Sequence, residues 1–272
     1  MSAFGDEVSP DLDVQIATLK RLGIDGLDVR SVGDVNVLNL SDSELSEVRK
    51  ACQVAGLAIR GVGSPVNKVP MTAENRPVEM QKLKRSIEAA KVLGTSLIRI
   101  FSPIANRADD DMRAWPEVKA WLGEMASRAR DAGVVLLHEN DGDFFGAYPN
   151  NCRRLLEELG GPHFRAVFDF ANTLLLGYLP MRDWFPWILP HLDSMHIKDV
   201  VRSEGRVVPA GEGDGEMTDT LRLALESGWS GTLTLEPHLK AGGPYGGTSG
   251  PELFEVAVAA LRRTVEDAGG SC

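Results

Sequence analysis

The sequence predicts an α/β fold, a single (β/α)8 TIM barrel domain formed by residues 1–272. Three observations predict it. Eight short apolar runs alternate with segments of helical periodicity along the whole chain. Glycines recur between a helical segment and the next apolar run, as expected of repeated β–α units. The length of 272 residues suits eight such units, because one barrel of this kind takes about 250 residues.

The apolar runs are the predicted strands, and each is short enough for one pass through a barrel. They are Ser2–Asp6, Asp25–Arg30, Leu57–Val62, Ser96–Phe101, Val134–Glu139, Arg165–Phe170, Leu192–Lys198 and Thr232–Glu236. The clear helical segments between them are Leu12–Leu22, Asp42–Ala55, Glu79–Leu93, Ala114–Ala132, Asn150–Leu159, Thr218–Ser227 and Glu252–Ala268. A weaker helical pattern covers Met181–Leu189, with Pro186 inside it.

Local signals mark where these helices begin and end. Ser41 and Glu44 have the spacing of a capping box. Five glycines follow predicted helices, where a left-handed residue commonly ends a helix. They are Gly23, Gly56, Gly94, Gly133 and Gly228. Two Gly- and Pro-rich stretches, 210–215 and 241–250, follow the last two strands and are predicted to be loops on the active face of the barrel.

Composition narrows the classes of partner. The formal charge of −10 argues against a nucleic-acid partner, because that affinity comes largely from Lys and Arg. The sequence contains no apolar stretch of membrane-spanning length and no signal-peptide pattern at its start. Three cysteines without CxxC spacing fit a reducing compartment. We therefore expect a cytoplasmic protein without a membrane partner.

Four successive predicted strands end in metal-ligand residue types. These are Glu139, Asp169, His196 and Glu236. Charged side chains directly after apolar runs are costly to bury unless they are paired or bind a metal. Oxygen and nitrogen ligands without thiolate suit one divalent ion, namely Mn²⁺, Mg²⁺, Co²⁺, Fe²⁺ or Zn²⁺. The alternative is a cluster of ion pairs at the barrel rim.

The chain resembles the sugar phosphate isomerase/epimerase superfamily, the xylose isomerase-like TIM barrels. The segments that carry the resemblance include LLHEND, VFDFAN, HIKDV, VPAGEGDG and LEPHL. The resemblance implies that Glu139, Asp169, His196 and Glu236 ligate the metal, and that Glu139 and Glu236 are also the acid/base pair. It implies isomerisation or epimerisation of a sugar, keto-sugar or related polyhydroxy compound through a metal-stabilised enediolate. Proteins of similar families commonly form homodimers or homotetramers, so the resemblance implies one of these states.

One position departs from the ketose 3-epimerases of that superfamily, which carry a histidine three residues after the strand-six aspartate. Here it is Asn172, whose amide binds a hydroxyl but carries no proton at neutral pH. The substrates of those epimerases therefore do not transfer directly. A metal-dependent lyase, such as a keto-inositol dehydratase-like enzyme, remains an alternative use of the same site. A non-catalytic sugar-binding barrel and an endonuclease IV-type repair enzyme are further alternatives, and the latter needs more histidines and a basic groove.

Weaker candidates for substrate contacts surround these strand ends. Lys198 has the same strand orientation as His196, and it either holds a substrate oxygen or pairs with a ligand carboxylate. His238 follows Glu236 by two residues and either lines the mouth or orients a ligand. The remaining candidates lie after strands or in loops, where a structural role is an open alternative. They are Lys68, Arg99, Glu7 and Glu212.

Overall fold

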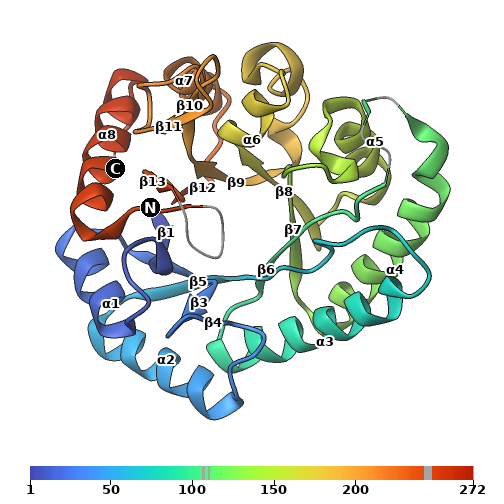
Figure 1. Cartoon of the computed structure of the whole chain (residues 1–272), viewed down its shortest axis with the longest axis horizontal. Helices are drawn as coiled ribbons and strands as arrows, with labels where there is room; N and C mark the ends of the chain where they lie inside the picture. Colours follow the sequence, from blue (N-terminus) through green and yellow to red (C-terminus); the bar gives the residue numbers. More distant parts are fainter. Residues whose placement is uncertain (106–107, 110, 242–246, 272) are drawn as a thin grey trace.

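The computed structural model describes residues 1–105, 108–109, 111–241 and 247–271. Eight parallel strands close into a barrel with a ring of helices outside it (Figure 1). In chain order the barrel strands are β1 (Ser2–Phe4), β2 (Gly26–Val29), β5 (Ala58–Gly63), β6 (Leu97–Ile100), β7 (Val135–Glu139), β8 (Phe164–Asp169), β9 (Leu192–Ile197) and β12 (Thr232–Leu235). β1 pairs with both β2 and β12, which closes the barrel and confirms the predicted fold class.

Each barrel strand is followed along the chain by one outer helix. They are α1 (Leu12–Arg21), α2 (Asp42–Ala55), α3 (Asn75–Leu93), α4 (Trp115–Ala132), α5 (Pro149–Leu159), α6 (Phe170–Leu175), α7 (Met217–Glu226) and α8 (Gly250–Asp267). At the seam of the ring, Arg21 on α1 pairs with Glu255 on α8 at 2.9 Å. The last helix therefore returns to the first, as Figure 1 shows.

The predicted strand bounds agree with the structure to within two residues at each end. The capping box is present, with Ser41 accepting from the backbone of Glu44 and Glu44 accepting from the backbone of Ser41. The five predicted helix-ending glycines all have positive φ. Their left-handed conformation ends each helix and turns the chain toward the next strand.

The weak helix predicted over Met181–Leu189 is wrong. The structure has a π-helical turn at Pro180–Trp184 and a 3-10 turn at Leu189–His191. The α-helix of this unit is α6, which starts directly after β8 because the Asp169 carboxylate accepts from the backbone N–H of Asn172 at 2.8 Å. The unit therefore has its helix immediately beside the strand end.

Three short two-stranded sheets complete the loops. They are β3–β4 (Ser31–Val32 with Val35–Asn36), β10–β11 (Asp199–Val201 with Arg206–Val208) and β13–β14 (Lys240–Ala241 with Gly247–Thr248). Residues 242–246 of the predicted active-face loop lie outside the described residues, as does Cys272. Cys52 and Cys152 are buried and not in disulfides.

The stretch 210–215 folds around the carboxylate of Asp199. That carboxylate accepts from the backbone N–H groups of Gly211, Gly213 and Gly215 at 2.9–3.0 Å, and from Val200 at 2.8 Å. Four donors to one buried carboxylate fix the loop against the β10–β11 hairpin. The hairpin and this loop therefore behave as one wall beside the barrel mouth.

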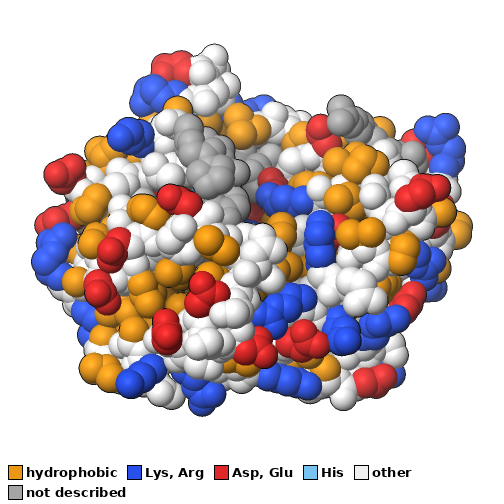
Figure 2. Space-filling view, turned by 60° about the horizontal axis from the view of Figure 1, so that its bottom comes forward, with side chains coloured by type: hydrophobic (Ala, Val, Ile, Leu, Met, Phe, Trp, Pro, Cys, Tyr) orange, Lys and Arg blue, Asp and Glu red, His pale blue; other side chains and the backbone are white. Residues whose placement is uncertain are grey.

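The outer surface carries mixed charges. Figure 2 shows acidic and basic side chains interspersed with hydrophobic ones over the face that it displays. Among the described residues, none of the helices is long and apolar enough to cross a bilayer.

Candidate metal centre

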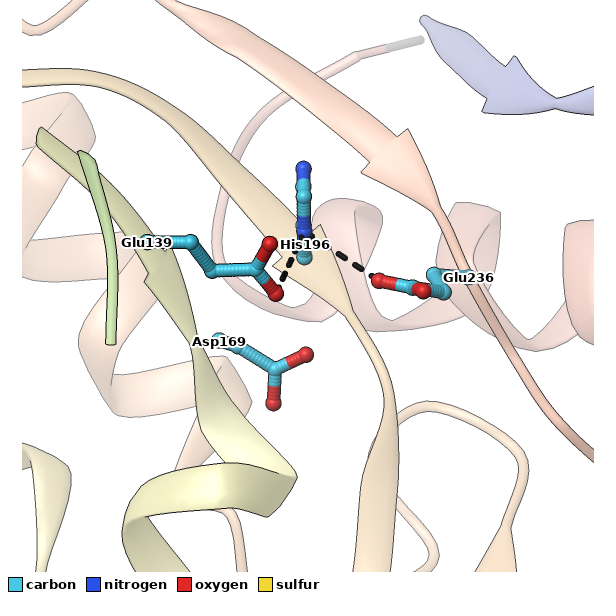
Figure 3. Close-up of side chains that lie close together, drawn as sticks. All are labelled: Glu139, Asp169, His196 and Glu236. Carbon is cyan, nitrogen blue, oxygen red and sulfur yellow. Dashed lines mark ion pairs between the residues drawn. The ribbon is translucent and has the colours of Figure 1, made fainter. Parts of the chain in front are cut away.

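Four side chains from neighbouring strand ends converge at the barrel mouth (Figure 3). Glu139, Asp169, His196 and Glu236 each offer one ligand atom, and these atoms lie within 4.8 Å of one another. All four residues are buried, with at most 4% of their surface exposed. The structure thus brings together the four residues that the strand ends singled out.

Strand register explains the convergence. Asp169 on β8 lies directly opposite His196 on β9, and Thr234 on β12 lies opposite His196 on the other side. In a parallel barrel these C-terminal strand ends open on one face. Figure 3 shows His196 between Glu139 and Glu236, with Asp169 beside them.

Asn140 locks two of the strand ends together. Its amide donates to the carbonyl oxygen of Asp169 at 3.0 Å and accepts from the backbone N–H of Asp169 at 2.7 Å. Asn140 follows Glu139 directly, so one side chain fixes the ends of β7 and β8 relative to each other. The spacing between the carboxylates of Glu139 and Asp169 depends on this link.

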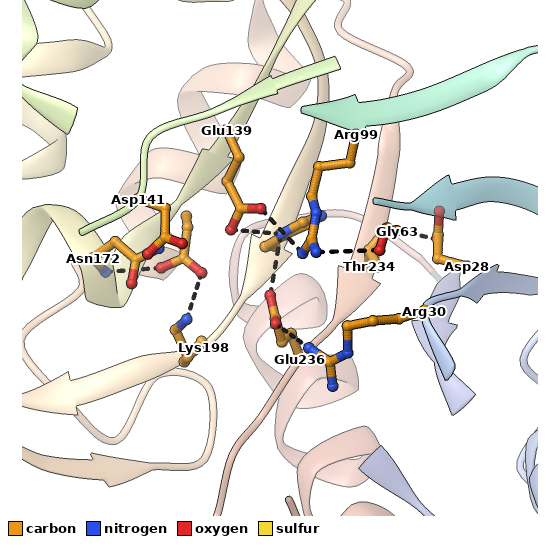
Figure 4. A network of polar contacts seen from close by, with 12 residues as sticks. Asp28, Arg30, Gly63, Arg99, Glu139, Asp141, Asn172, Lys198, Thr234 and Glu236 are labelled. Atoms are coloured by element: carbon orange, nitrogen blue, oxygen red, sulfur yellow. Dashed lines mark hydrogen bonds and ion pairs between the residues drawn. The ribbon is translucent and has the colours of Figure 1, made fainter. Parts of the chain in front are cut away.

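Each carboxylate of the cluster has its own cation (Figure 4). Arg99 Nη1 lies 3.2 Å from Glu139 Oε2, and Lys198 Nζ lies 2.9 Å from Asp169 Oδ2. Arg30 Nη1 donates to Glu236 Oε1 at 2.6 Å. Each of the three buried carboxylates therefore has a cation beside it, which lowers the cost of keeping that carboxylate inside the barrel.

Phe4 forms the floor under this arrangement. Its ring contacts the edge of the His196 ring at a centroid distance of 5.1 Å. The guanidinium groups of Arg30 and Arg99 lie 4.7 and 5.0 Å from the same ring centroid. One aromatic ring therefore supports the histidine and two of the cations by edge and cation–π contacts.

The pKa values of the two glutamates are held low. Burial alone raises the pKa of Glu139, but His196 and Arg99 outweigh it and bring the pKa to about 2. Burial also opposes ionisation of Glu236, yet Lys198, His196 and Arg30 lower its pKa well below the usual range. Both glutamates are therefore carboxylates at neutral pH, as a base must be.

His196 and Asp169 shift in the opposite direction. Burial lowers the pKa of His196, but Glu139 and Glu236 outweigh this and raise it to about 9. Its Nδ1 lies 3.1 Å from Glu139 Oε1 and 3.2 Å from Glu236 Oε2. Burial raises the pKa of Asp169 to about 6, although Lys198 acts against the shift. A proton on His196 thus lies between the carboxylates of Glu139 and Glu236.

The cluster fits a divalent cation. Within the described residues, one buried atom of each member has no aligned hydrogen bond, namely Glu139 Oε2, Asp169 Oδ2, His196 Nδ1 and Glu236 Oε2. The ion-pair contacts above are close in distance but do not satisfy these atoms. Bonds of about 2.0–2.2 Å to one ion keep two ligands within about 4.4 Å of each other. The observed spacing is close to that value.

A cavity of about 880 Å³ opens above the cluster. Five of the residues predicted to contact substrate line it, and these are Lys198, Asn172, His238, Lys68 and Arg99. Lys68 reaches in from the loop after β5, where its Nζ lies 2.6 Å from Asp141 Oδ2 and 4.2 Å from the centroid of Phe101. Asn172 Nδ2 is buried and has no hydrogen-bond partner among the described residues.

The other two predicted contacts are elsewhere. Glu212 lies in the loop 210–215, where it is half exposed and 3.6 Å from Arg263. Glu7 is fully buried behind the cavity wall. Its Oε1 lies 2.6 Å from His238 Nδ1, while His238 Nε2 lies 3.5 Å from Glu236 Oε1. The structure therefore places Glu7 against His238 rather than in the cavity.

Sequence reasoning missed three contributors to this site. Asn140 looks like an ordinary residue after a strand, and Asp141 looks like a turn residue, although it lines the cavity. Phe4 looks like one more apolar strand residue. Arg30 was visible as the charged end of the second strand, but its three carboxylate partners, Asp6, Glu7 and Glu236, come from distant segments.

Comparisons with known proteins place this geometry in context. A family model described as xylose isomerase-like TIM barrel matches residues 16–264. The chain is 26% identical over 222 residues to the 2-epi-5-epi-valiolone 7-phosphate 2-epimerase of Actinoplanes sp., covering 79% of this chain and 77% of the relative.

Solved structures share the fold across nearly the whole chain. D-Psicose 3-epimerase of Clostridium cellulolyticum H10 with D-tagatose has a TM-score of 0.76 and 15% identity, covering 100% of this chain and 99% of that one. A xylose isomerase-like TIM barrel protein of Mycobacterium smegmatis in complex with magnesium has a TM-score of 0.68 and 19% identity, covering 93% and 88%.

Proposed function

The chain belongs to the xylose isomerase-like TIM barrel family, within the sugar phosphate isomerase/epimerase superfamily, and from that premise we propose that it is a divalent-metal-dependent sugar isomerase or epimerase. Its substrate is a sugar, keto-sugar or related polyhydroxy compound. The observation that carries the proposal is the buried cluster with Glu139 and Glu236 on either side of His196, at 3.1 and 3.2 Å.

Glu139, Asp169, His196 and Glu236 would hold the ion. When bound, it supplies a Lewis acid for a carbonyl oxygen and a neighbouring hydroxyl. The donor set of three carboxylates and one imidazole suits Mn²⁺ or Mg²⁺. The likeness to a solved structure that contains magnesium supports the same class of ion.

The two glutamates carry the proton. Glu139 and Glu236 extend from β7 and from the end of β12, so they approach a bound carbon from different sides. One carboxylate removes the proton next to the carbonyl. The other, once it has taken up a proton from solvent through the open cavity, returns that proton on the opposite face, and the first carboxylate then releases its proton to solvent. Arg99 and Arg30 keep the two groups ionised before the reaction, since each lowers the pKa of its partner.

Four groups around the cluster hold the substrate. Lys198 and Arg99 present positive charge toward the cavity, and Asn172 presents a buried amide N–H that has no partner among the residues that the structure describes. His238 presents its Nε2, with Glu7 fixing the ring from behind. These donors suit hydroxyl and carbonyl oxygens.

Deuterium exchange tests the proposal. Metal-loaded protein is incubated in D₂O with a panel of ketoses, keto-glycosides and their phosphates, and products are followed by NMR and mass spectrometry. We expect deuterium next to the carbonyl, with the mass otherwise unchanged, and loss of this activity on chelation. Loss of water from the substrate identifies the lyase alternative instead. If no compound exchanges with any divalent ion, the proposed function is wrong.

A further inference from the structure

One side of the cavity is apolar, although the centre below it is highly charged. Ala171 and Leu175 on α6 and Val207 on β11 line this side, which we name the apolar wall. Leu175 is 57% exposed, the largest such fraction among the large hydrophobic residues of the barrel mouth. A single exposed leucine on an outer surface is ordinary, but this one faces the cavity of the proposed active site.

The apolar wall is formed by α6 together with the β10–β11 hairpin, which pack against each other. Ala171 packs with Val200 in one buried cluster. Val200 on β10 lies directly opposite Val207 on β11, so both side chains lie on the same face of the hairpin. Ala171 and Leu175 are four residues apart on α6 and lie above each other on the helix.

The same elements connect the apolar wall to the acidic centre. Asp169 caps α6, and Asn172 lies between Ala171 and Leu175 along that helix. Lys198 directly precedes β10. Asn172 and Lys198 therefore line the same cavity as Leu175 and Val207 and lie on, or directly beside, the elements that carry the apolar wall.

The cavity has room for such a group. Its volume of about 880 Å³ is near the upper end of the range of about 300–1,000 Å³ for sites that take drug-sized ligands. A single monosaccharide is smaller than a drug-sized ligand, so it leaves part of this volume unfilled. Three residues of the lining, Ala171, Leu175 and Val207, have side chains that cannot donate hydrogen bonds to sugar hydroxyls, although Arg206 beside Val207 can.

We propose that the substrate has two parts, a polyhydroxy ring at the acidic centre and an apolar ring substituent on the apolar wall. This inference rests on the proposed function and narrows its substrate class. The substituent gains by removing Leu175 and Val207 from water, whereas a hydroxylated group there does not. The wall therefore selects a glycoside or substituted cyclitol over a free sugar.

A matched ligand pair tests the inference. Methyl and phenyl 3-keto-β-D-glucopyranoside differ only in the substituent, and calorimetry measures the binding of each to Mg²⁺-loaded protein. We expect the phenyl compound to bind at least about tenfold more tightly. Leu175→Asn and Val207→Thr should reduce that ratio toward one, with methyl-compound affinity retained. Leu253→Asn, the same change at an exposed leucine on α8, should leave the ratio unaltered.

The outcomes separate the two proposals. Equal affinities in the unsubstituted protein, binding of neither compound, or an unaltered ratio in both wall variants overturns the inference. A change of oligomeric state in Leu175→Asn, with the ratio retained, shows that Leu175 contacts a second copy and also overturns it. The deuterium exchange panel decides the proposed function independently, because the unsubstituted ketoses in it need no apolar wall.

Discussion

Lys198 Nζ lies 2.9 Å from Asp169 Oδ2, inside the same cluster in which a divalent ion would contact Asp169. Burial lowers the pKa of Lys198, but Asp169 and the neighbouring carboxylates raise it by more. The net shift is upward, so Lys198 stays charged. A protein cation and a divalent ion would therefore share the Asp169 carboxylate. The effect of a bound divalent ion on the free energy of unfolding should therefore depend on the Lys198–Asp169 pair.

Replacing Lys198 tests that link. Lys198→Met leaves the buried Asp169 carboxylate without its partner, so the metal-free protein should lose about 3–5 kcal/mol of unfolding free energy. A saturating divalent ion should restore part of the loss, because it supplies positive charge to the same oxygen. Urea denaturation with and without Mg²⁺ measures both. Lys119→Met, which breaks an exposed pair with Glu158, should change the unfolding free energy far less and with no metal dependence. Equal losses for Lys198→Met in both conditions contradict the prediction.

Metal affinity should rise with pH. His196 has a pKa of about 9 in the metal-free protein, so it is protonated at pH 7 and must lose that proton to ligate an ion. Affinity should therefore increase about tenfold per pH unit up to about 9, where it levels off. Below pH 6 the slope should steepen, because Asp169, with a pKa of about 6, also takes up a proton. Calorimetric titration of Mn²⁺ in buffers of different ionisation enthalpy counts the released protons, and a flat affinity from pH 6.5 to 8.5 would exclude this assignment.

The role of Glu139 and Glu236 as proton carriers can be tested separately from their role as metal ligands. Glu139→Gln and Glu236→Gln each keep an amide oxygen for the ion but lose the basic carboxylate. Turnover and deuterium incorporation should fall at least about a hundredfold in each. Bound metal, measured by elemental analysis, shows whether the ion is retained. Glu117→Gln, on the exposed side of α4, is the matched control with unchanged turnover. Full activity in both site variants removes the acid/base assignment.

The β10–β11 hairpin and the loop 210–215 should depend on the carboxylate of Asp199 for their order. Each Asp199 oxygen accepts from two backbone N–H groups, so Asp199→Asn, which replaces one oxygen with a donating NH₂, turns two of the four hydrogen bonds repulsive. Amide hydrogen exchange in residues 202–216 should accelerate, while exchange in β7 and β8 stays slow. We expect a stability loss of about 1–3 kcal/mol. Unchanged exchange in the loop would show that other contacts hold it.

The fold and the four residues of the buried cluster were predictable from sequence because their signals are local. Glu139, Asp169 and Glu236 are charged residues at the ends of apolar runs, and this pattern has few physical explanations. The helix-ending glycines are equally local, since each reflects the backbone angle at one residue. Such features repeat once per β–α unit and locate the strand ends without knowledge of the packing.

The remaining parts of the site depend on contacts between distant segments. Asp199 accepts from glycines 12–16 residues away, and nothing in its own neighbourhood shows that role. Helix α6 was missed because it is only one and a half turns long, and Asp169 serves as both its cap and a predicted ligand. Glu7 appeared to be a cavity residue because the sequence does not reveal that His238, with φ of +48°, lies between it and the mouth.

The two-way hydrogen bond between Asn140 and the backbone of Asp169 has a consequence for ion selectivity. Because β7 and β8 are joined at this point, Glu139 and Asp169 are already ordered before an ion arrives. Uptake then loses little conformational entropy, and its free energy depends mainly on exchanging the ion's water shell for ligands at a preset spacing. A site of this kind discriminates among divalent ions by radius and by ease of dehydration, and much less by chain flexibility.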